Sequence, residues 1–224
     1  MKDTGMAHSG TVPLTVPLCE PRREPPDGAE LKINIGSGVS GVSGWHNLDN
    51  SPTILLSRIP LGRRLFRTPR WPSDVRRHDV TRGLPFAERS VSYIYSSHTL
   101  EHFTWEESLR VARECFRVLR EGGVLRVVVP DLQLLVREYQ QDADPRASHR
   151  FLQRLSLGHT IRDLIHPGAN HSQMFDQRSL AHLLQQAGFA QPEVSRFQES
   201  RIPDIAAIEL EARKRESLYV EAVR

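Results

Sequence analysis

The residues best suited to chemistry in this sequence begin with a glycine-rich turn. It reads Gly36-Ser37-Gly38-Val39-Ser40-Gly41 and follows directly on an alternating apolar segment, residues 31–35. Glycines let a backbone turn sharply and approach a bound molecule closely. The pattern therefore predicts a strand that runs into a turn against which a ligand can lie.

Two acidic residues follow the next two segments that are expected to be strands. Asp49 ends residues 45–48, and Asp79 ends residues 75–78. In a parallel sheet the ligand lies at the carboxyl ends of the strands, so both acids and the glycine turn would share one edge. Asp49 is well placed to accept hydrogen bonds from ribose hydroxyls. An adenosine-containing ligand is the expectation.

Histidines supply the candidates for acid–base work, because their pKa lies near neutral pH. His98 follows the β-forming segment 91–95 and is the first candidate for a catalytic base. His171 is the second, in an irregular segment that could form a roof over the site. For His102 and His166, capping or a satisfied buried hydrogen bond is the more common role.

A metal site is weighed and not expected. His98, Glu101 and His102 have side chains of the types that bind metals. However, His98 and His102 share a face only if their segment is helical, and the capping box at Thr104–Glu107 indicates that the regular helix starts later.

Strand and helix patterns alternate along the chain, which predicts an α/β, doubly wound sheet. After Thr104, apolar residues recur at helical spacing and predict one buried face, made of Trp105, Leu109, Ala112, Phe116 and Leu119. Gly122-Gly123 is expected to end that helix.

Further along, residues 124–129 form a mostly apolar run that is typical of a strand covered on both faces. Asp131 and Asp176 are expected to cap two more helices, the second ended by Gly188. Residues 194–197 and 218–223 are expected to be the closing strands, and residues 53–66 a further helix.

Length and composition limit the remaining classes. The 224 residues, 25 % of them charged, suit a single domain over residues 30–224 behind a flexible proline-rich leader, residues 1–29. We expect no membrane span and no secretory signal, and hence a cytoplasmic protein. The 2 cysteines are too few for a disulfide scaffold or a cysteine-based zinc site.

Several ordered motifs resemble the class I S-adenosylmethionine-dependent methyltransferases. The resemblance is to small bacterial members with an LPF…LEH…RVLxxGG core, here at Leu84-Pro85-Phe86, Leu100-Glu101-His102 and Arg117–Gly123. It covers residues 31–135 and continues more loosely to the C-terminus. It implies a Rossmann-like, seven-stranded sheet whose last strand, here residues 218–223, runs antiparallel, and it implies S-adenosylmethionine as cofactor.

The resemblance also implies a place for each site residue. Gly36, Ser37 and Gly38 would lie at the methionine end of the cofactor, and Asp49 would hold the ribose hydroxyls. Asp79 and Val80 would flank the adenine. Ser97 and His98 would line the face where the methyl group is transferred. The implied reaction is methyl transfer, with O-methylation of a small molecule, sugar or glycan precursor as the favoured form.

Three other functions are weighed. A dinucleotide site needs a helix after the glycines and an acid about 20 residues on. Here Asp49 follows Gly36 by only 13 residues, and Gly41 and Gly44 interrupt the space, so a shortened first helix is expected and NAD is disfavoured. Nucleic acid is disfavoured because few aromatic residues accompany the basic ones. A non-catalytic module that binds the cofactor or a partner stays open.

The segments expected to bind the methyl acceptor have the least regular sequence patterns. Residues 53–72 and 142–175 are expected to build its pocket. Arginine pairs well with phosphate and carboxylate. Eight arginines crowd into one stretch, which favours an anionic acceptor such as a phosphosugar: Arg58, Arg63, Arg64, Arg67, Arg70, Arg76, Arg77 and Arg82.

Overall fold

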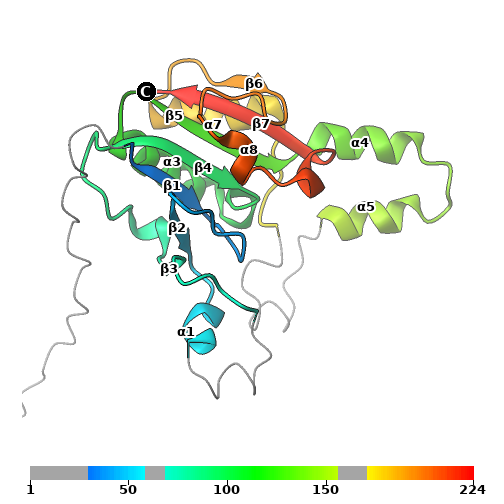
Figure 1. The fold of residues 1–224 in the computed structure, drawn as a ribbon. Helices are drawn as coiled ribbons and strands as arrows, with labels where there is room; N and C mark the ends of the chain where they lie inside the picture. Colours follow the sequence, from blue (N-terminus) through cyan, green and yellow to red (C-terminus); the bar gives the residue numbers. More distant parts are fainter. Residues whose placement is uncertain (1–29, 59–68, 156–170) are drawn as a thin grey trace, which may run out of the picture.

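A computed structural model describes residues 30–58, 69–155 and 171–224. Their strands form one sheet, with helices packed on its faces and a pair of helices extending from one end (Figure 1). The proposed leader, residues 1–29, lies outside the described residues, as do Arg63, Arg64, Arg67 and His166.

The described strands form a seven-stranded sheet in the order β3-β2-β1-β4-β5-β7-β6. Their bounds are Lys32–Ile35 (β1), His46–Asp49 (β2), Arg76–Arg77 (β3), Val91–Ser97 (β4), Leu119–Pro130 (β5), Glu193–Ser195 (β6) and Ser217–Val223 (β7). β7 is antiparallel to both of its neighbours, β5 and β6, whereas β1 to β5 pair in parallel. The predicted α/β sheet with an antiparallel last strand is confirmed.

Each face of the sheet buries its own apolar cluster. The larger cluster lies where α3 (Trp105–Val118) and α7 (Gln177–Ala187) cover one face. The smaller one includes Trp45, Tyr95 and Ile208, and α8 (Ile205–Ile208) covers it on the opposite face. β5 passes between the two clusters, so its continuous apolar run is buried on both sides, as the sequence predicts.

The connection between β1 and β2 contains no helix, and all of its residues, 36–45, are described. The sequence allows at most one helical turn there, and the chain forms only turns. Positive φ angles at Gly36, Gly38 and Gly44 are incompatible with a continuous right-handed helix. The first helix, which was predicted to be shortened to one turn at most, is therefore absent from this connection.

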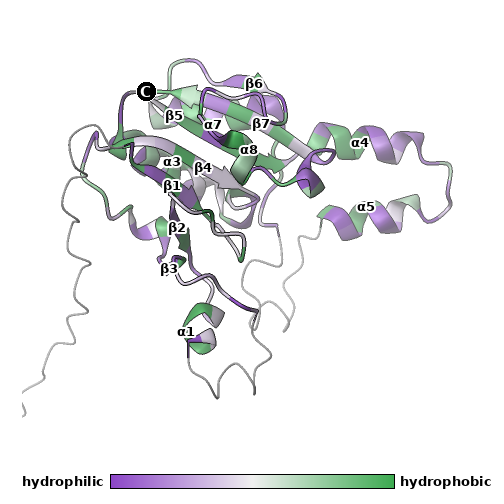
Figure 2. Cartoon of the chain, in the orientation of Figure 1, coloured by the Kyte–Doolittle hydropathy of each residue, from purple (hydrophilic) through white to green (hydrophobic). Residues whose placement is uncertain are grey.

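The predicted helix starts are confirmed by their capping hydrogen bonds. Thr104 and Glu107 form a reciprocal capping box at the start of α3. Asp131 accepts hydrogen bonds from the first amides of α4 (Leu132–Gln141), and Asp176 caps α7, which ends at Gly188 in the left-handed conformation. α4 and α5 (Ala147–Leu155) carry alternating hydrophilic and hydrophobic stretches (Figure 2).

Two expectations about α3 are wrong in detail. The helix ends at Val118, because Leu119 already has an extended conformation and pairs with Val91 of β4. Gly122-Gly123 therefore lies inside β5, at an irregularity in its pairing with β4, and does not cap the helix.

The buried face of α3 is also rotated relative to the prediction. Its fully buried residues are Ser108, Val111, Ala112, Cys115 and Val118. Of the predicted face, Trp105, Leu109 and Phe116 only pack against the edge of the core. Of the helix expected over residues 53–66, α1 (Thr53–Ser57) is present, and residues 59–66 lie outside the described chain.

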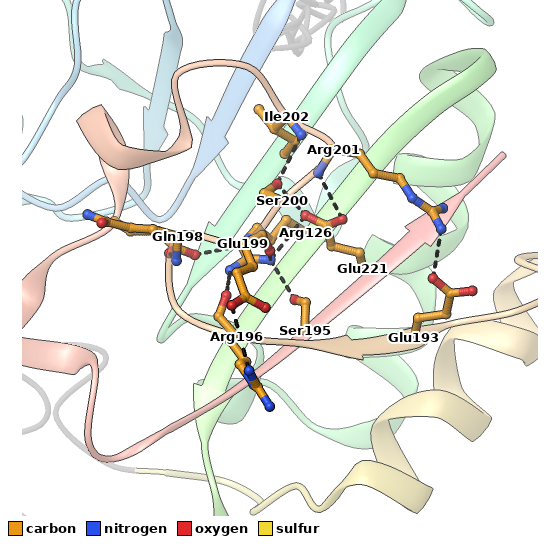
Figure 3. A network of polar contacts seen from close by, with 11 residues as sticks. Arg126, Glu193, Ser195, Arg196, Gln198, Glu199, Ser200, Arg201, Ile202 and Glu221 are labelled. Carbon is orange, nitrogen blue, oxygen red and sulfur yellow. Dashed lines mark hydrogen bonds and ion pairs between the residues drawn. The ribbon is translucent and has the colours of Figure 1, made fainter.

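A buried arginine holds the C-terminal segment 195–221 against the sheet (Figure 3). Arg126 of β5 has no exposed surface and donates to Glu209 Oε1 at 2.5 Å and to Glu221 Oε1 at 3.0 Å. It also donates to Ser195 Oγ and to the backbone carbonyls of Arg196 and Glu199. All five partners come from residues 195–221, so one guanidinium orders β6, the approach to α8, and β7.

We expect Arg126→Met to lower the free energy of unfolding by about 3–5 kcal/mol, because it leaves Glu209 and Glu221 buried without their partner. Urea denaturation measures the change. Arg120→Met is the matched control, since Arg120 is exposed on the same strand. Equal losses in the two variants would show that the network adds nothing to stability.

Candidate active site

A cavity of about 730 Å³ opens at the carboxyl edge of the parallel strands, within the size range of ligand sites. Its wall contains every predicted site residue except His171: Gly36, Ser37, Gly38, Asp49, Asp79, Val80, Ser97 and His98. Residues from four separate segments thus meet at one place. The sequence-based expectation of a shared edge agrees with this geometry.

The glycine turn is shaped by one close contact. Gly36 has φ +68°, and a Cβ at this position would lie 1.9 Å from Thr99 Oγ1. The backbone N–H groups of Gly36 and Ser37 both donate to the carbonyl of Leu48. The turn is therefore pressed against the end of β4 on one side and tied to β2 on the other, and only glycine fits at its start.

Asp49 holds the turn from the opposite side. Its Oδ2 accepts a hydrogen bond from the Gly38 N–H at 2.9 Å, and its Oδ1 accepts one from the Ser51 N–H at 2.8 Å. A carboxylate offers about four lone-pair positions. Asp49 can therefore still accept hydrogen bonds from a ligand that lies in the cavity, as the ribose prediction requires.

Asp79 and Val80 begin a short 3-10 turn at the cavity wall. Asp79 Oδ1 accepts hydrogen bonds from the backbone N–H and the hydroxyl of Thr81, and its Oδ2 lies 3.1 Å from Arg82 Nε. Val80 is buried and contributes to the larger core. The carboxylate is thus fixed in orientation by its own turn.

His98 lies on the wall in an unusual conformation, with φ +49°. Its Nε2 shares a hydrogen bond with Ser217 Oγ at 2.9 Å, and its Nδ1 is 3.3 Å from Glu101 Oε1. Both ring nitrogens therefore face protein groups. To accept a proton from a substrate, His98 has to exchange one of these contacts for the substrate.

His171 is near His98 but does not line the cavity. It belongs to a group with Glu101 and His102 whose candidate ligand atoms all lie within 4.8 Å of one another. Burial lowers the pKa of His171 below its ordinary value, so its imidazole is neutral at pH 7. His102 joins the two features, because it also lines the cavity.

The far wall of the cavity comes from a segment that was not predicted from the sequence to line it. Ile208, Leu210 and Arg213 line the cavity, whereas the described parts of residues 53–72 and 142–175 do not. One signal for this was available. β7 is antiparallel, so the segment that precedes it must lie at the edge where the parallel strands end.

Residues 46–127 match a family described as "Methyltransferase domain". This segment is a methyltransferase-domain match. It begins at β2 and ends within β5, and it therefore includes Asp49, Asp79 and His98. The match and the sheet order support S-adenosylmethionine as the cofactor. No curated protein is a significant match to the chain.

The solved structures that match this chain are distant from it in sequence. PigF with S-adenosylhomocysteine is 15 % identical with a TM-score of 0.50, over 87 % of this chain and 50 % of PigF. An S-adenosylmethionine-dependent methyltransferase from Mesorhizobium loti is 21 % identical with a TM-score of 0.49, over 88 % and 92 %.

A third structure, described as a possible exported protein from Bordetella parapertussis, is 14 % identical with a TM-score of 0.48. It is matched over 87 % of this chain and 61 % of its own. The chain thus spans only part of two of these three proteins.

In the described residues, no helix combines the length and apolarity that a membrane crossing needs.

We expect Gly36→Ala to lower stability and to weaken the binding of S-adenosylhomocysteine, because the added methyl group displaces Thr99. Gly44→Ala is the control: Gly44 has a similar backbone strain, φ +83°, but no atom within 4 Å of its added Cβ. The strain alone costs about 1–2 kcal/mol in each variant. Thermal denaturation and calorimetric titration would contradict the role of the contact if both variants behaved alike.

Proposed function

We propose that this protein transfers a methyl group from S-adenosylmethionine to an oxygen of a small molecule, sugar or glycan precursor. The observation that supports this most is the convergence of the glycine turn, Asp49, Asp79 and His98 on one cavity. The family match covers three of these four features. The assignment of a methyltransferase domain rests on that family match. The choice of acceptor rests on the residues that line the cavity.

The cavity residues suit the cofactor. Asp49 has lone pairs left for ribose hydroxyls, and the backbone of residues 36–38 offers a surface without side chains over Gly36 and Gly38. Asp79 and Val80 offer a carboxylate and an apolar side chain for the amino group and the ring of adenine. S-adenosylmethionine supplies a sulfonium-activated methyl group. The protein then has to align the acceptor and exclude water.

An anionic acceptor is supported by two arginines on the cavity wall. Arg77 and Arg213 both line the cavity and are exposed. Arg58 donates to the carbonyl of Val75, and Arg82 is paired with Asp79. Arg77 is thus the member of the predicted cluster whose position best suits a phosphate or carboxylate on the acceptor. Arg213 lies on the far wall and is ion-paired with Glu216 at 2.7 Å.

His98 is the proposed base where the acceptor must lose a proton. Its place beside Ser97 on the wall supports this role. In such a mechanism the acceptor hydroxyl replaces Ser217 at Nε2, while Glu101 stays near Nδ1 and holds the orientation of the ring. His171 is the weaker candidate, since its ring lies beside that of His102, with centroids 5.4 Å apart, and it does not line the cavity.

A second function is favoured by one observation. The two nitrogens of His98 already have protein partners, as they would in a domain that binds the cofactor without turning it over. Such a module keeps Asp49 and the glycine turn and loses only the transfer step. Binding and turnover therefore have to be measured separately.

We expect Asp49→Asn to weaken S-adenosylhomocysteine binding about 10- to 100-fold, because hydrogen bonds to a charged group contribute about 1.5–3 kcal/mol each. Isothermal titration calorimetry measures the affinity. Asp142→Asn, an exposed residue at the end of α4, serves as the control. An unchanged affinity in Asp49→Asn would remove Asp49 from the cofactor site.

We expect His98→Asn to lower kcat by about 10²–10⁴-fold and to leave the affinity for S-adenosylhomocysteine unchanged, because a positioned base contributes that much. Asparagine also tolerates the positive φ of this position. The assay follows a labelled methyl group from the cofactor to phosphorylated and unphosphorylated sugars.

Three outcomes of that assay are informative. Transfer that prefers the phosphorylated acceptor, and loses this preference in Arg77→Gln, supports the anionic acceptor. Cofactor binding with no transfer to any acceptor in a cell extract favours the non-catalytic module. Full activity in His98→Asn would show that no base acts at this position.

A further inference from the structure

Glu101 is a fully buried carboxylate whose two oxygens accept no hydrogen bond from any residue that the structure describes. Its side chain has no exposed surface, and both Oε1 and Oε2 lack a donor among the described residues. Burying an ionised carboxylate is costly unless it is paired or bound to a cation. The 3.3 Å approach of His98 Nδ1 to Oε1 provides an ion pair only when His98 is protonated.

Two histidines stand next to this carboxylate from different parts of the chain. His102 follows Glu101 in the 3-10 turn Leu100–His102, and His171 comes from the segment before α7. The Nδ1 atom of His171 is also buried and has no hydrogen-bond partner within the described part of the chain. Candidate ligand atoms of Glu101, His102 and His171 lie within 4.8 Å of one another.

The backbone fixes this arrangement independently of any ligand. The N–H groups of Ser172 and Gln173 donate to the carbonyl of Glu101, the first at 2.7 Å. Ser172 Oγ donates to the carbonyl of His102, and the side chain of Gln173 donates to the carbonyl of Phe103. His171 is thus held beside the 3-10 turn by its two successors.

From this geometry we propose that Glu101, His102 and His171 bind a divalent metal ion of the zinc class. Two imidazoles and one carboxylate are a ligand set that zinc uses in sites with one open position. Ligands of a tetrahedral zinc ion lie about 3.3 Å apart, given bonds of about 2.0–2.1 Å. Donor atoms within 4.8 Å of one another reach that spacing by small side-chain rotations.

The ion compensates the buried charge of Glu101 and links the turn at 100–102 to the segment that leads into α7. It lies at the margin of the proposed active-site cavity, because His102 belongs to both. The site does not depend on the proposed methyl transfer. The spacing of His98, Glu101 and His102 does not by itself predict a metal site, because the third proposed ligand, His171, lies 70 residues after Glu101.

The test is zinc binding by untagged, chelator-treated protein, followed by titration calorimetry and by thermal denaturation with and without Zn²⁺. We expect one zinc ion per chain in a saturable step and a melting temperature that rises with zinc, because the ion binds only the folded state. Glu101→Gln and His171→Ala should each abolish the step. His149→Ala, which changes an exposed histidine on α5, should keep it.

A second measurement keeps the proposal open to refutation where a variant folds poorly. Each variant is first shown to bind S-adenosylhomocysteine or to retain its circular dichroism. In metal-free protein, we expect Glu101→Gln to melt no lower than the wild type, because it removes a charge without hydrogen bonds. No saturable zinc step in the wild type would overturn the proposal, as would an equal loss in His149→Ala and His171→Ala.

Discussion

The buried guanidinium of Arg126 is the interaction on which the rest of the site depends. It is desolvated within the sheet and finds all of its partners in residues 195–221, so the chain after α7 has one way to satisfy it. A buried charge tolerates few alternatives, because each lost partner costs free energy. The far-wall residues Ile208 and Leu210 lie on either side of Glu209, which makes the shortest of those hydrogen bonds. The position of this wall is therefore fixed by electrostatics in the core.

The near wall is organised by backbone hydrogen bonds. The glycine turn donates to Leu48 and to Asp49, and Asp49 also accepts from Ser51. These contacts replace the hydrogen bonds that a helix would have provided after β1. The two walls thus depend on different physics, and they meet because β7 begins at the edge where β1, β2 and β4 end.

Local patterns made most of the fold predictable. Capping residues such as Thr104 and Asp176 act within one turn, and the alternating or continuous apolar runs report whether a strand is covered on one face or both. The exact end of α3 was not predictable, because strand pairing between Val91 and Leu119 overrides the glycines that follow. The same local signals predicted that the glycine turn, Asp49, Asp79 and His98 share one edge, and these residues line one cavity. The place of Arg213 on the cavity wall and the proximity of Glu101 to His171 were not predicted, since both bring together segments far apart in sequence and no local pattern marks them.

The turn between β1 and β2 has a consequence for how the cavity meets its ligand. Its conformation is held by hydrogen bonds within the chain, to Asp49 and Leu48. Binding then requires little ordering of the chain, and the entropy that flexible loops lose on association is largely avoided. Association with this wall resembles the docking of a ligand onto a rigid surface, and selectivity has to come from shape and from the hydrogen bonds that remain available.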